Sequence, residues 1–203
     1  MIDLSKLSEY LQLFKELSLE DAKFFFTLTR QRHLKAGELY VQAGEMHRKV
    51  AHVKSGLMRA YIIDENGEEA TLFFRKEDQQ VAPYDCIFAD KPSRMFLEAF
   101  ENTTLIEVDY DKLQEFMHRH PQYEKARKHF HQKLLMESFL RLENFILYPP
   151  LQRYQKFVKE QPDLAQRVPD KYLDQYFRYY PGLFKPHTQA HKTKGQKLTI
   201  VNF

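Results

Sequence analysis

Glycines divide the stretch from Leu34 to Asp109 into short apolar segments, and this spacing constrains the fold more than any other feature of the sequence. Two segments with alternating apolar residues are joined through residues 64–67, which end in Asn66-Gly67. Asn-Gly favours the positive φ angles of a tight turn, so this region predicts a β-hairpin. Four of the six glycines lie in the stretch: Gly37, Gly44, Gly56 and Gly67.

A pattern of an apolar residue, a turn and an acid in residues 34–38 is repeated in residues 42–45. The repeat is too short for helices and is typical of a winding β-roll. Residues 94–100 and 103–109 supply closing strands. We therefore predict one compact β-domain over residues 33–109.

The first 32 residues predict helices that precede this domain. Apolar residues recur at intervals of three and four, at Leu4, Leu7, Leu11, Phe14 and Leu17. Ser18 then caps a second helix, with Asp21 three residues later. Because neither helix carries residues suited to chemistry, we expect both to cover an edge and one end of the roll.

The composition favours a cytoplasmic protein. Hydrophobic residues make up 43% of the chain and charged residues 29%, and no apolar run is long enough to span a bilayer. No signal peptide is visible, and we expect no membrane partner. The single cysteine, Cys86, excludes an internal disulfide and a four-thiolate iron–sulfur cluster, so we interpret it as a buried thiol.

Residues 110–148 predict a short helix capped by Asp109 and a long helix that begins near Pro121 and ends at Pro149. The long helix carries a broad apolar stripe, and one domain cannot bury such a stripe at both ends. We therefore expect it to pair with a second copy across a two-fold axis. The alternative is packing against its own roll alone. Four residues represent the predicted dimer face: Phe130, Leu134, Phe139 and Leu142.

Histidines cluster around this helix without a spacing that suits a metal. They form two pairs, each two residues apart, which on a helix turns the two rings to nearly opposite sides. The pairs are His118 with His120 and His129 with His131. No catalytic triad and no paired-carboxylate motif stands out. We therefore predict no metal site, no cofactor, no catalytic residues and no enzymatic activity.

Four phrases of the sequence resemble the catabolite-activator and fumarate-nitrate-regulator (Crp/Fnr) family. They are LKAGELYVQAGE, VKSGLMRAYIIDENGEE, LEAFENTTLIEVD and LAQRVPDKYLDQY, and the resemblance covers residues 10–176. It implies an α+β fold with N-terminal helices and a cyclic-nucleotide-binding-like β-roll, a double-stranded β-helix, as the sensor domain. A long dimerisation helix and a C-terminal winged helix-turn-helix follow.

The resemblance also implies an effector pocket. In members that bind cyclic nucleotides, a Gly-Glu pair opens a short helix that holds the phosphate, and an Arg-Ser/Thr-Ala step pairs with its charge. By position, the corresponding residues here are Glu77, Ser93 and Arg94. The glycine and the alanine are absent, and the serine precedes the arginine. We therefore expect no binding of cyclic AMP, and a roll that is either without a ligand or controlled by a different small molecule.

Residues 149–203 carry ten basic and four acidic residues, an excess that suits nucleic acid but also suits a solvated tail. The resemblance implies a DNA-binding domain here and assigns DNA contacts to Arg167, Lys171 and Tyr172. The resemblance stops after Tyr176. The recognition helix is replaced by an aberrant tail, residues 177–203, that contains helix breakers: Pro181, Gly182 and Pro186.

The genetic code suggests a frameshift as the origin of this tail. Residues 176–198 can be encoded so that removal of one T gives YLGITQASLSRIRKHTKQKGKS followed by a stop codon. That alternative reading restores the turn, the recognition helix and a basic end in the order of the family. The alternative origin is a natural divergent tail.

The sequence thus predicts a transcriptional regulator that binds DNA as a homodimer and is controlled by an unidentified effector in its β-roll. The alternative is a β-roll sensing or interaction module without sequence-specific DNA binding. The domains are residues 1–32, 33–109, 110–148 and 149–203.

Overall fold

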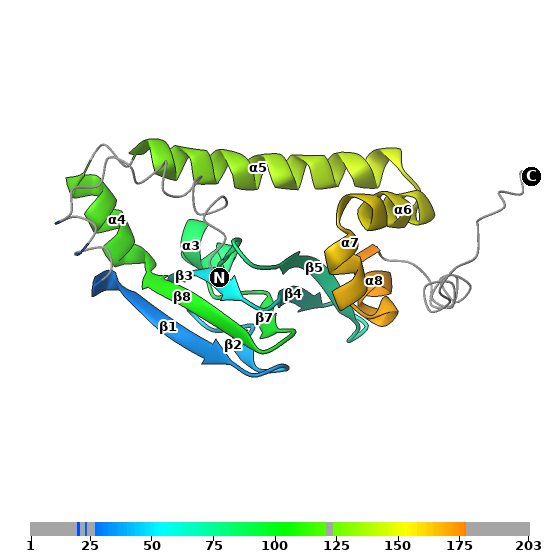
Figure 1. Cartoon of the computed structure of the whole chain (residues 1–203), viewed down its shortest axis with the longest axis horizontal. Coiled ribbons are helices and arrows are strands. Elements are labelled where there is room, and N and C mark those ends of the chain that lie inside the picture. The colour runs from blue at the N-terminus through cyan, green and yellow to red at the C-terminus, as the bar shows by residue number, and fades with distance from the viewer. Residues whose placement is uncertain (1–19, 21–22, 24–26, 121–123, 178–203) are drawn as a thin grey trace, which may run out of the picture. The chain divides into compact units, whose positions relative to one another are not determined.

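The computed structural model describes residues 27–120 and 124–177, together with Glu20 and Lys23 (Figure 1). The chain divides into two compact units, residues 1–148 and 149–203, and each is described by itself. The first unit contains the strands of a β-roll and three described helices, and the second contains three short helices. The predicted α+β class with a β-roll is confirmed.

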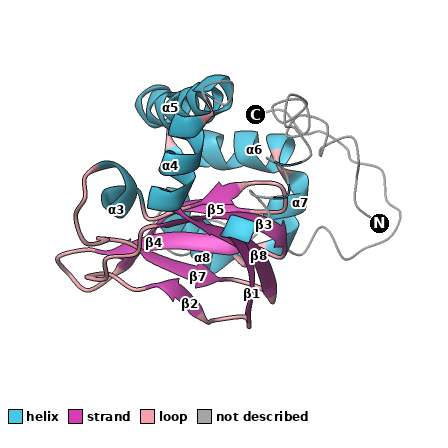
Figure 2. Cartoon of the chain, turned by 90° about the vertical axis from the view of Figure 1, so that its left-hand side faces the viewer, coloured by secondary structure: helices cyan, strands magenta, loops and turns pink. Residues whose placement is uncertain are grey.

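Two four-stranded antiparallel sheets form the roll (Figure 2). One sheet has the order β1-β8-β3-β6 and the other the order β2-β7-β4-β5, so the chain crosses between the sheets several times. The strands are β1 (Thr29–Leu34), β2 (Leu39–Val41), β3 (Lys49–Ser55), β4 (Met58–Ile63), β5 (Glu69–Arg75), β6 (Gln80–Val81), β7 (Phe96–Ala99) and β8 (Thr103–Asp109).

An apolar core lies between the two sheets because alternate residues of each strand point inward. On β4, for example, Met58 and Ala60 are fully buried in this core. The remaining buried members come from six other strands and from the residue before β7: Leu34, Tyr40, Val41, Ala51, Val53, Val81, Met95, Leu97, Ala99 and Leu105. The glycine-separated segments of the sequence thus supply both faces of one core.

Three crossings between the sheets meet at Gly56, which joins β3 to β4. The Gly56 N–H donates to Glu77 Oε1 at 2.9 Å, and Glu77 lies in the crossing from β5 to β6. The next residue, Leu57, contacts the crossing from β7 to β8, because its N–H donates to Thr103 Oγ1 at 3.2 Å and its carbonyl accepts the N–H of Phe100 at 2.7 Å. These bonds fix the two sheets relative to each other at one corner.

The hairpin between β4 and β5 is confirmed, but its turn differs from the predicted tight type. The strands end at Ile63 and begin again at Glu69, and of the loop residues only Gly67 has a positive φ, +80°. The Asp64 side chain accepts the N–H groups of Asn66 and Glu68 instead. A loop that is closed by an aspartate in this way does not require positive φ at its asparagine.

The roll begins earlier than the predicted boundary at residue 33, because β1 starts at Thr29. β1 is an edge strand that pairs with β8 and whose exposed residues are polar. Thr27 and Leu28 are helical, and Leu28 packs against the helix α4 (Tyr110–Arg119). The predicted N-terminal helices otherwise fall on residues 1–19, 21–22 and 24–26, outside the described residues.

Three described helices complete the first unit: α3 (Tyr84–Phe88), α4 and α5 (Glu124–Leu147). As predicted, Asp109 caps α4, since its Oδ1 accepts the N–H groups of Asp111 and Lys112. Both ribbon views place α5 on the side of the roll that carries α3. The roll thus presents α3 towards the long helix.

The second unit contains α6 (Pro150–Glu160), α7 (Pro162–Arg167) and α8 (Asp170–Phe177). Its buried apolar residues are Phe157, Leu164, Val168, Leu173 and Phe177. The side chain of Arg153, on α6, donates from Nη2 to the carbonyl of Phe177 at 3.1 Å and so satisfies the end of α8. In the described residues of either unit, no helix is long and apolar enough to cross a membrane.

We predict that Gly56→Ala destabilises the roll more than Gly67→Ala. At Gly56, φ is +96°, and an added Cβ would lie 2.5 Å from Thr103 Oγ1 and 2.6 Å from the carbonyl of Asn102. The expected loss is more than about 2 kcal/mol in the free energy of unfolding.

Gly67 is the matched control, because its φ is also positive, at +80°, but an added Cβ would meet nothing within 4 Å. Its loss should be about 1 kcal/mol. Urea unfolding of both variants measures the difference, and equal losses would contradict the steric argument.

Candidate functional site

Two of the three predicted effector residues, Ser93 and Arg94, lie beside α3. Arg94 donates from Nε and Nη2 to Asp85 Oδ1 at 3.1 and 2.9 Å, and from its backbone N–H to Asp85 Oδ2 at 3.1 Å. Partial burial opposes the ionisation of Asp85, but the hydrogen bonds from Arg94 outweigh it and lower the pKa of Asp85. The guanidinium that the resemblance assigns to an effector phosphate is therefore paired with a carboxylate of α3 itself.

Ser93 has a structural environment. It is buried, its hydroxyl donates to the carbonyl of Met95 at 2.8 Å, and its backbone N–H donates to the carbonyl of Glu45 at 2.9 Å. In return the N–H of Gly44 donates to the carbonyl of Ser93 at 2.8 Å. These bonds tie the loop before β7 to the turn after β2 and hold Arg94 against α3.

The structure does not place Glu77 with Ser93 and Arg94. Glu77 binds the backbone of Gly56 at the crossing of the sheets, and β6 separates it from α3. The short helix that the resemblance implies begins at Tyr84, after Pro83, instead of at Glu77. Proline at that position has no N–H, so the helix start offers one donor fewer for an anion.

A second group of residues beside α3 was not predicted from the sequence. Arg75, the last residue of β5, lies 2.9 Å from Glu137 of α5, measured from Nη2 to Oε2. The same Nη2 donates to the hydroxyl of Tyr84, on α3, at 3.4 Å, and the guanidinium carbon lies 4.8 Å from the centre of the Phe73 ring. Arg75 therefore contacts α3 and α5 together.

The charge of Arg75 is well defined in this position. Burial alone lowers the pKa of a guanidinium, but the oxygens of Tyr84 and Glu137 hold the pKa of Arg75 above its ordinary value. The side chain is 13% exposed, and its Nε is buried without a hydrogen-bond acceptor among the described residues. The result is a permanent, largely buried cation with one donor unsatisfied.

Aromatic rings connect the same three elements. The ring of Tyr84 lies 5.7 Å from that of Phe73 and stacks on that of Phe88 at 6.0 Å. The ring of Phe88 in turn meets that of His131, on α5, edge to face at 5.6 Å. Rings at these separations attract one another by about 0.5–1.5 kcal/mol beyond their burial. Polar and aromatic contacts thus link β5, α3 and α5.

A polar group lies inside the roll, at inward positions of three strands. The Tyr40 hydroxyl donates to Glu107 Oε2 at 3.1 Å, and Lys49 Nζ donates to Glu107 Oε1 at 2.7 Å. Burial and the Glu107 charge raise the pKa of Tyr40. The ring of His47 lies edge to face with that of Tyr40 at 4.7 Å, and its Nε2 is buried without a hydrogen-bond partner among the described residues.

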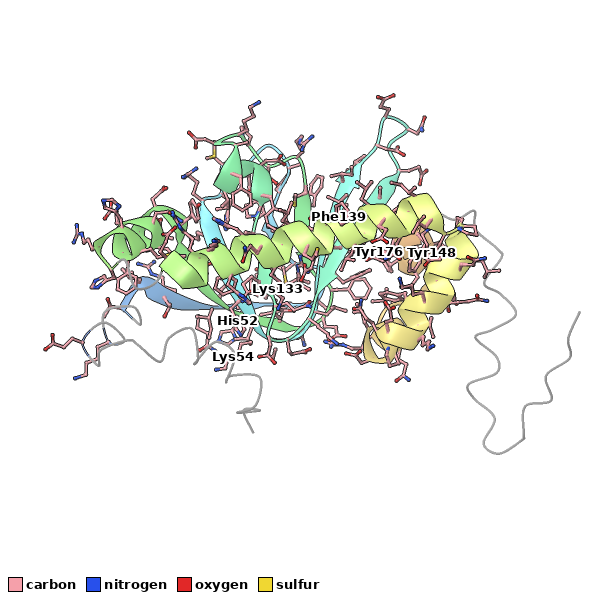
Figure 3. All side chains as sticks on the ribbon, turned by 90° about the horizontal axis from the view of Figure 1, so that it is seen from above. His52, Lys54, Lys133, Phe139, Tyr148 and Tyr176 are labelled. Carbon is pink, nitrogen blue, oxygen red and sulfur yellow. The ribbon has the colours of Figure 1, made fainter. Side chains whose placement is uncertain are left out.

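The four predicted dimer residues do not share one face of α5. Phe130 and Leu134 are half-buried, whereas Phe139 and Leu142 are exposed. The prediction combined two faces, because residues 130 and 139 are separated by nine positions, or about 180° around a helix. Figure 3 shows Phe139 and Lys133 on this helix.

The predicted DNA contacts lie close together in the second unit. Arg167 ends α7, and Lys171 and Tyr172 lie in the first turn of α8. The Lys171 ammonium lies 5.5 Å from the centre of the Tyr172 ring. Two acids share α8, and burial together with the charge of Asp170 raises the pKa of Asp174. Of the predicted aberrant tail, residues 177–203, only Phe177 is described, and it is the buried last residue of α8.

Comparison with known proteins first defines the class of the sensor domain. Residues 31–120 match the family model of the cyclic nucleotide-binding domain. No curated protein matches the chain. Residues 31–120, which include most of the β-roll, are therefore similar to a cyclic nucleotide-binding domain.

Solved structures then show a fold that extends beyond this domain. A putative transcriptional regulator of the Crp/Fnr family from Eubacterium rectale is 16% identical, with a TM-score of 0.69, over 85% of this chain and 82% of that one. FixK2 from Bradyrhizobium japonicum is 15% identical, with a TM-score of 0.67, over 80% of this chain and 86% of that one.

The catabolite activator protein of Thermus thermophilus is 19% identical, with a TM-score of 0.53, over 64% of this chain. The chain matches 61% of the length of that protein. The chain has the fold of the Crp/Fnr transcriptional regulators, which confirms the recognition made from the sequence. The likeness is to regulators and sensor domains.

We predict that the stability of the protein falls as the pH decreases below about 6.5, the ordinary pKa of histidine. Burial and the neighbouring Lys49 lower the pKa of His47. A histidine with a lowered folded-state pKa leaves stability intact above its unfolded pKa and reduces it as the pH falls through the folded value.

Thermal unfolding between pH 5 and pH 8 tests this expectation. The His47→Gln variant has no imidazole to protonate at this position and should reduce the slope of the unfolding temperature against pH. The His129→Gln variant, at an exposed position, should leave this slope unchanged. Equal slopes for wild type and His47→Gln would show that His47 does not titrate as its burial requires.

Proposed function

We propose that the protein is a cytoplasmic transcriptional regulator that binds DNA as a homodimer. The observation that carries the proposal is the order of its parts: a cyclic nucleotide-binding domain, a long helix and a three-helix unit. The likeness to a Crp/Fnr regulator over 85% of the chain supports the same order. DNA and a second copy of the chain are the proposed partners, with a small-molecule effector as a third.

The proposed dimer contact is an apolar seam on the outward side of α5. Its residues are spaced by four, three and four positions, which is the spacing of a coiled-coil seam. Each has a large apolar side chain that is at least 57% exposed, and burial of one such side chain stabilises by about 1.5–3 kcal/mol. The seam consists of Leu135, Phe139, Leu142 and Ile146.

The inward side of α5 supports this choice of face. The half-buried residues of the helix recur at intervals of three and four and so lie on one side of it. One of them, Glu137, pairs with Arg75 of the roll. Phe130 and Leu134 are apolar, and the other four are polar: Arg127, Glu137, Arg141 and Asn144. Because the roll takes this mixed stripe, the larger apolar stripe is left for a second helix.

DNA binding is proposed for the turn between α7 and α8 and for the residues that follow. Residues 149–177 carry five basic and four acidic residues, so most of the basic excess lies after Phe177. In the reading frame that removes one base, those residues become LGITQASLSRIRK, a turn and recognition helix of the family pattern. We propose that sequence-specific DNA binding requires this alternative frame.

The second candidate function is a sensing or interaction module without sequence-specific DNA binding. The breakers after α8 favour it, because Pro181 and Pro186 each disfavour a helix interior by about 3 kcal/mol. A basic chain without a fixed helix attracts phosphates but reads no base edges. In this case the dimer and the roll would be the functional parts.

The effector is proposed to be a small molecule other than cyclic AMP. Arg94 is paired with Asp85, α3 begins after a proline, and the neighbouring site is built from Phe73, Tyr84 and Arg75. None of these features reproduces the Gly-Glu and Arg-Ser/Thr-Ala steps of the resemblance. We therefore assign no phosphate role to Ser93 or Glu77.

We predict that Leu142→Glu converts the dimer into a monomer. A carboxylate in an apolar seam without a partner is costly, so the association constant should fall at least about 100-fold. Lys133→Glu is the control, because it changes the charge at an exposed position outside the seam. Sedimentation at micromolar concentration measures the mass, and a wild-type monomer would contradict the proposal.

We predict that Lys171→Ala weakens DNA binding and lowers its salt dependence. Loss of one phosphate contact should reduce the slope of log affinity against log salt by about 0.9. Lys159→Ala, an exposed lysine on α6, is the control and should leave the slope unchanged. Anisotropy titrations with duplex DNA at several salt concentrations measure both, and equal slopes would remove Lys171 from the interface.

A further inference from the structure

We propose that Arg75 is a positioning residue that joins α3 to α5 through its contacts with Tyr84 and Glu137. The two helices are thereby coupled without a ligand. The inference rests on the proposed role of α5 as the dimer helix, but its contacts lie within one copy of the chain. It assigns to Arg75, Tyr84 and Glu137 a role in regulation.

The half-buried positions in the second half of α5 are polar. Four of the six half-buried residues of the helix are polar, and Phe130 and Leu134 both lie before Glu137. Among the described residues of α5, no half-buried position after residue 134 carries a large apolar side chain. In that half, the ion pair of Glu137 with Arg75 supplies a directional contact with β5.

The helix α3 depends on its neighbours for its position. It has five residues and no side-chain hydrogen bond at its N-cap, and so short a helix is not stable by itself. Its position is set from outside, by Arg48 Nη1, which donates to the carbonyl of Cys86 at 2.7 Å, and by the pair of Asp85 with Arg94. A shift of α3 moves Tyr84 and Phe88 together.

Both of these aromatic residues of α3 contact the groups that lead to α5. The Tyr84 hydroxyl accepts from the same Nη2 of Arg75 that pairs with Glu137, and the Phe88 ring contacts His131. Two contacts thus connect α3 to α5: a polar one that leads to Glu137 and an aromatic one with His131.

The exposure of Glu137 makes the contact exchangeable. Glu137 is 39% exposed, so water can replace Arg75 as its partner. A ligand that displaces α3 therefore acts on the dimer helix by loosening an existing bond, and does not need to build a new one.

Hydrogen exchange of the full chain tests this inference without DNA. Glu137→Gln removes the charge of the partner and should raise exchange at least 10-fold both around residue 137 and in α3. The control is Glu143→Gln, an exposed position on the same helix, which should change neither segment. Sedimentation at the same protein concentration must give equal masses for the compared proteins, so that a change in dimerisation is not taken for a change in the Arg75–Glu137 contact.

A charge exchange separates the ion pair from general damage to the fold. Arg75→Glu alone should raise exchange in α3 and α5, and Arg75→Glu combined with Glu137→Arg should restore most of the protection. The inference is overturned if Glu137→Gln behaves like Glu143→Gln, if α5 loosens while α3 does not, or if the exchanged pair restores nothing. The failure of dimerisation or DNA binding alone would affect the proposed function and leave these results intact.

Discussion

The corner at Gly56 is the constraint on which the rest of the roll depends. Three crossings between the sheets meet there, and the Glu77 carboxylate and the Thr103 hydroxyl satisfy backbone groups that the sheets cannot pair. A side chain at Gly56 would overlap the backbone of residues 102 and 103. The crossing from β5 to β6 passes through this corner. The corner therefore also sets the position of Arg75, at the end of β5, and of α3, which follows β6.

The sequence predicted the roll well, because turns and alternating burial are local properties. The glycine spacing and the β4–β5 hairpin follow from residues a few positions apart. The predicted boundary of the roll, residue 33, lies four residues after the start of β1, because β1 is a polar edge strand and Arg30, Gln31 and Arg32 give no apolar alternation. An edge strand of this kind is recognised only through its partner, β8.

The candidate site was harder to predict, because its contacts join distant parts of the chain. No local pattern indicates that Arg75 meets Tyr84 and Glu137. The directions of these side chains depend on the bulge in the β4–β5 pairing and on the path of α3. The resemblance correctly indicated a short helix but placed it at Glu77, before β6. On α5, the apolar residues alone could not show which stripe the roll occupies, and the half-buried polar residues decide it.

The central claim, a dimeric regulator that reads DNA, is tested most directly by selection of bound sequences from a random DNA pool. The chain with the alternative frame after Tyr176 should enrich an inverted repeat whose half-sites lie about one helical turn apart, as expected for a two-fold dimer with a helix in each major groove. The chain that retains the tail of residues 177–203 should bind with salt sensitivity but enrich no sequence. If neither chain enriches an inverted repeat, the account of the protein as a transcriptional regulator is contradicted.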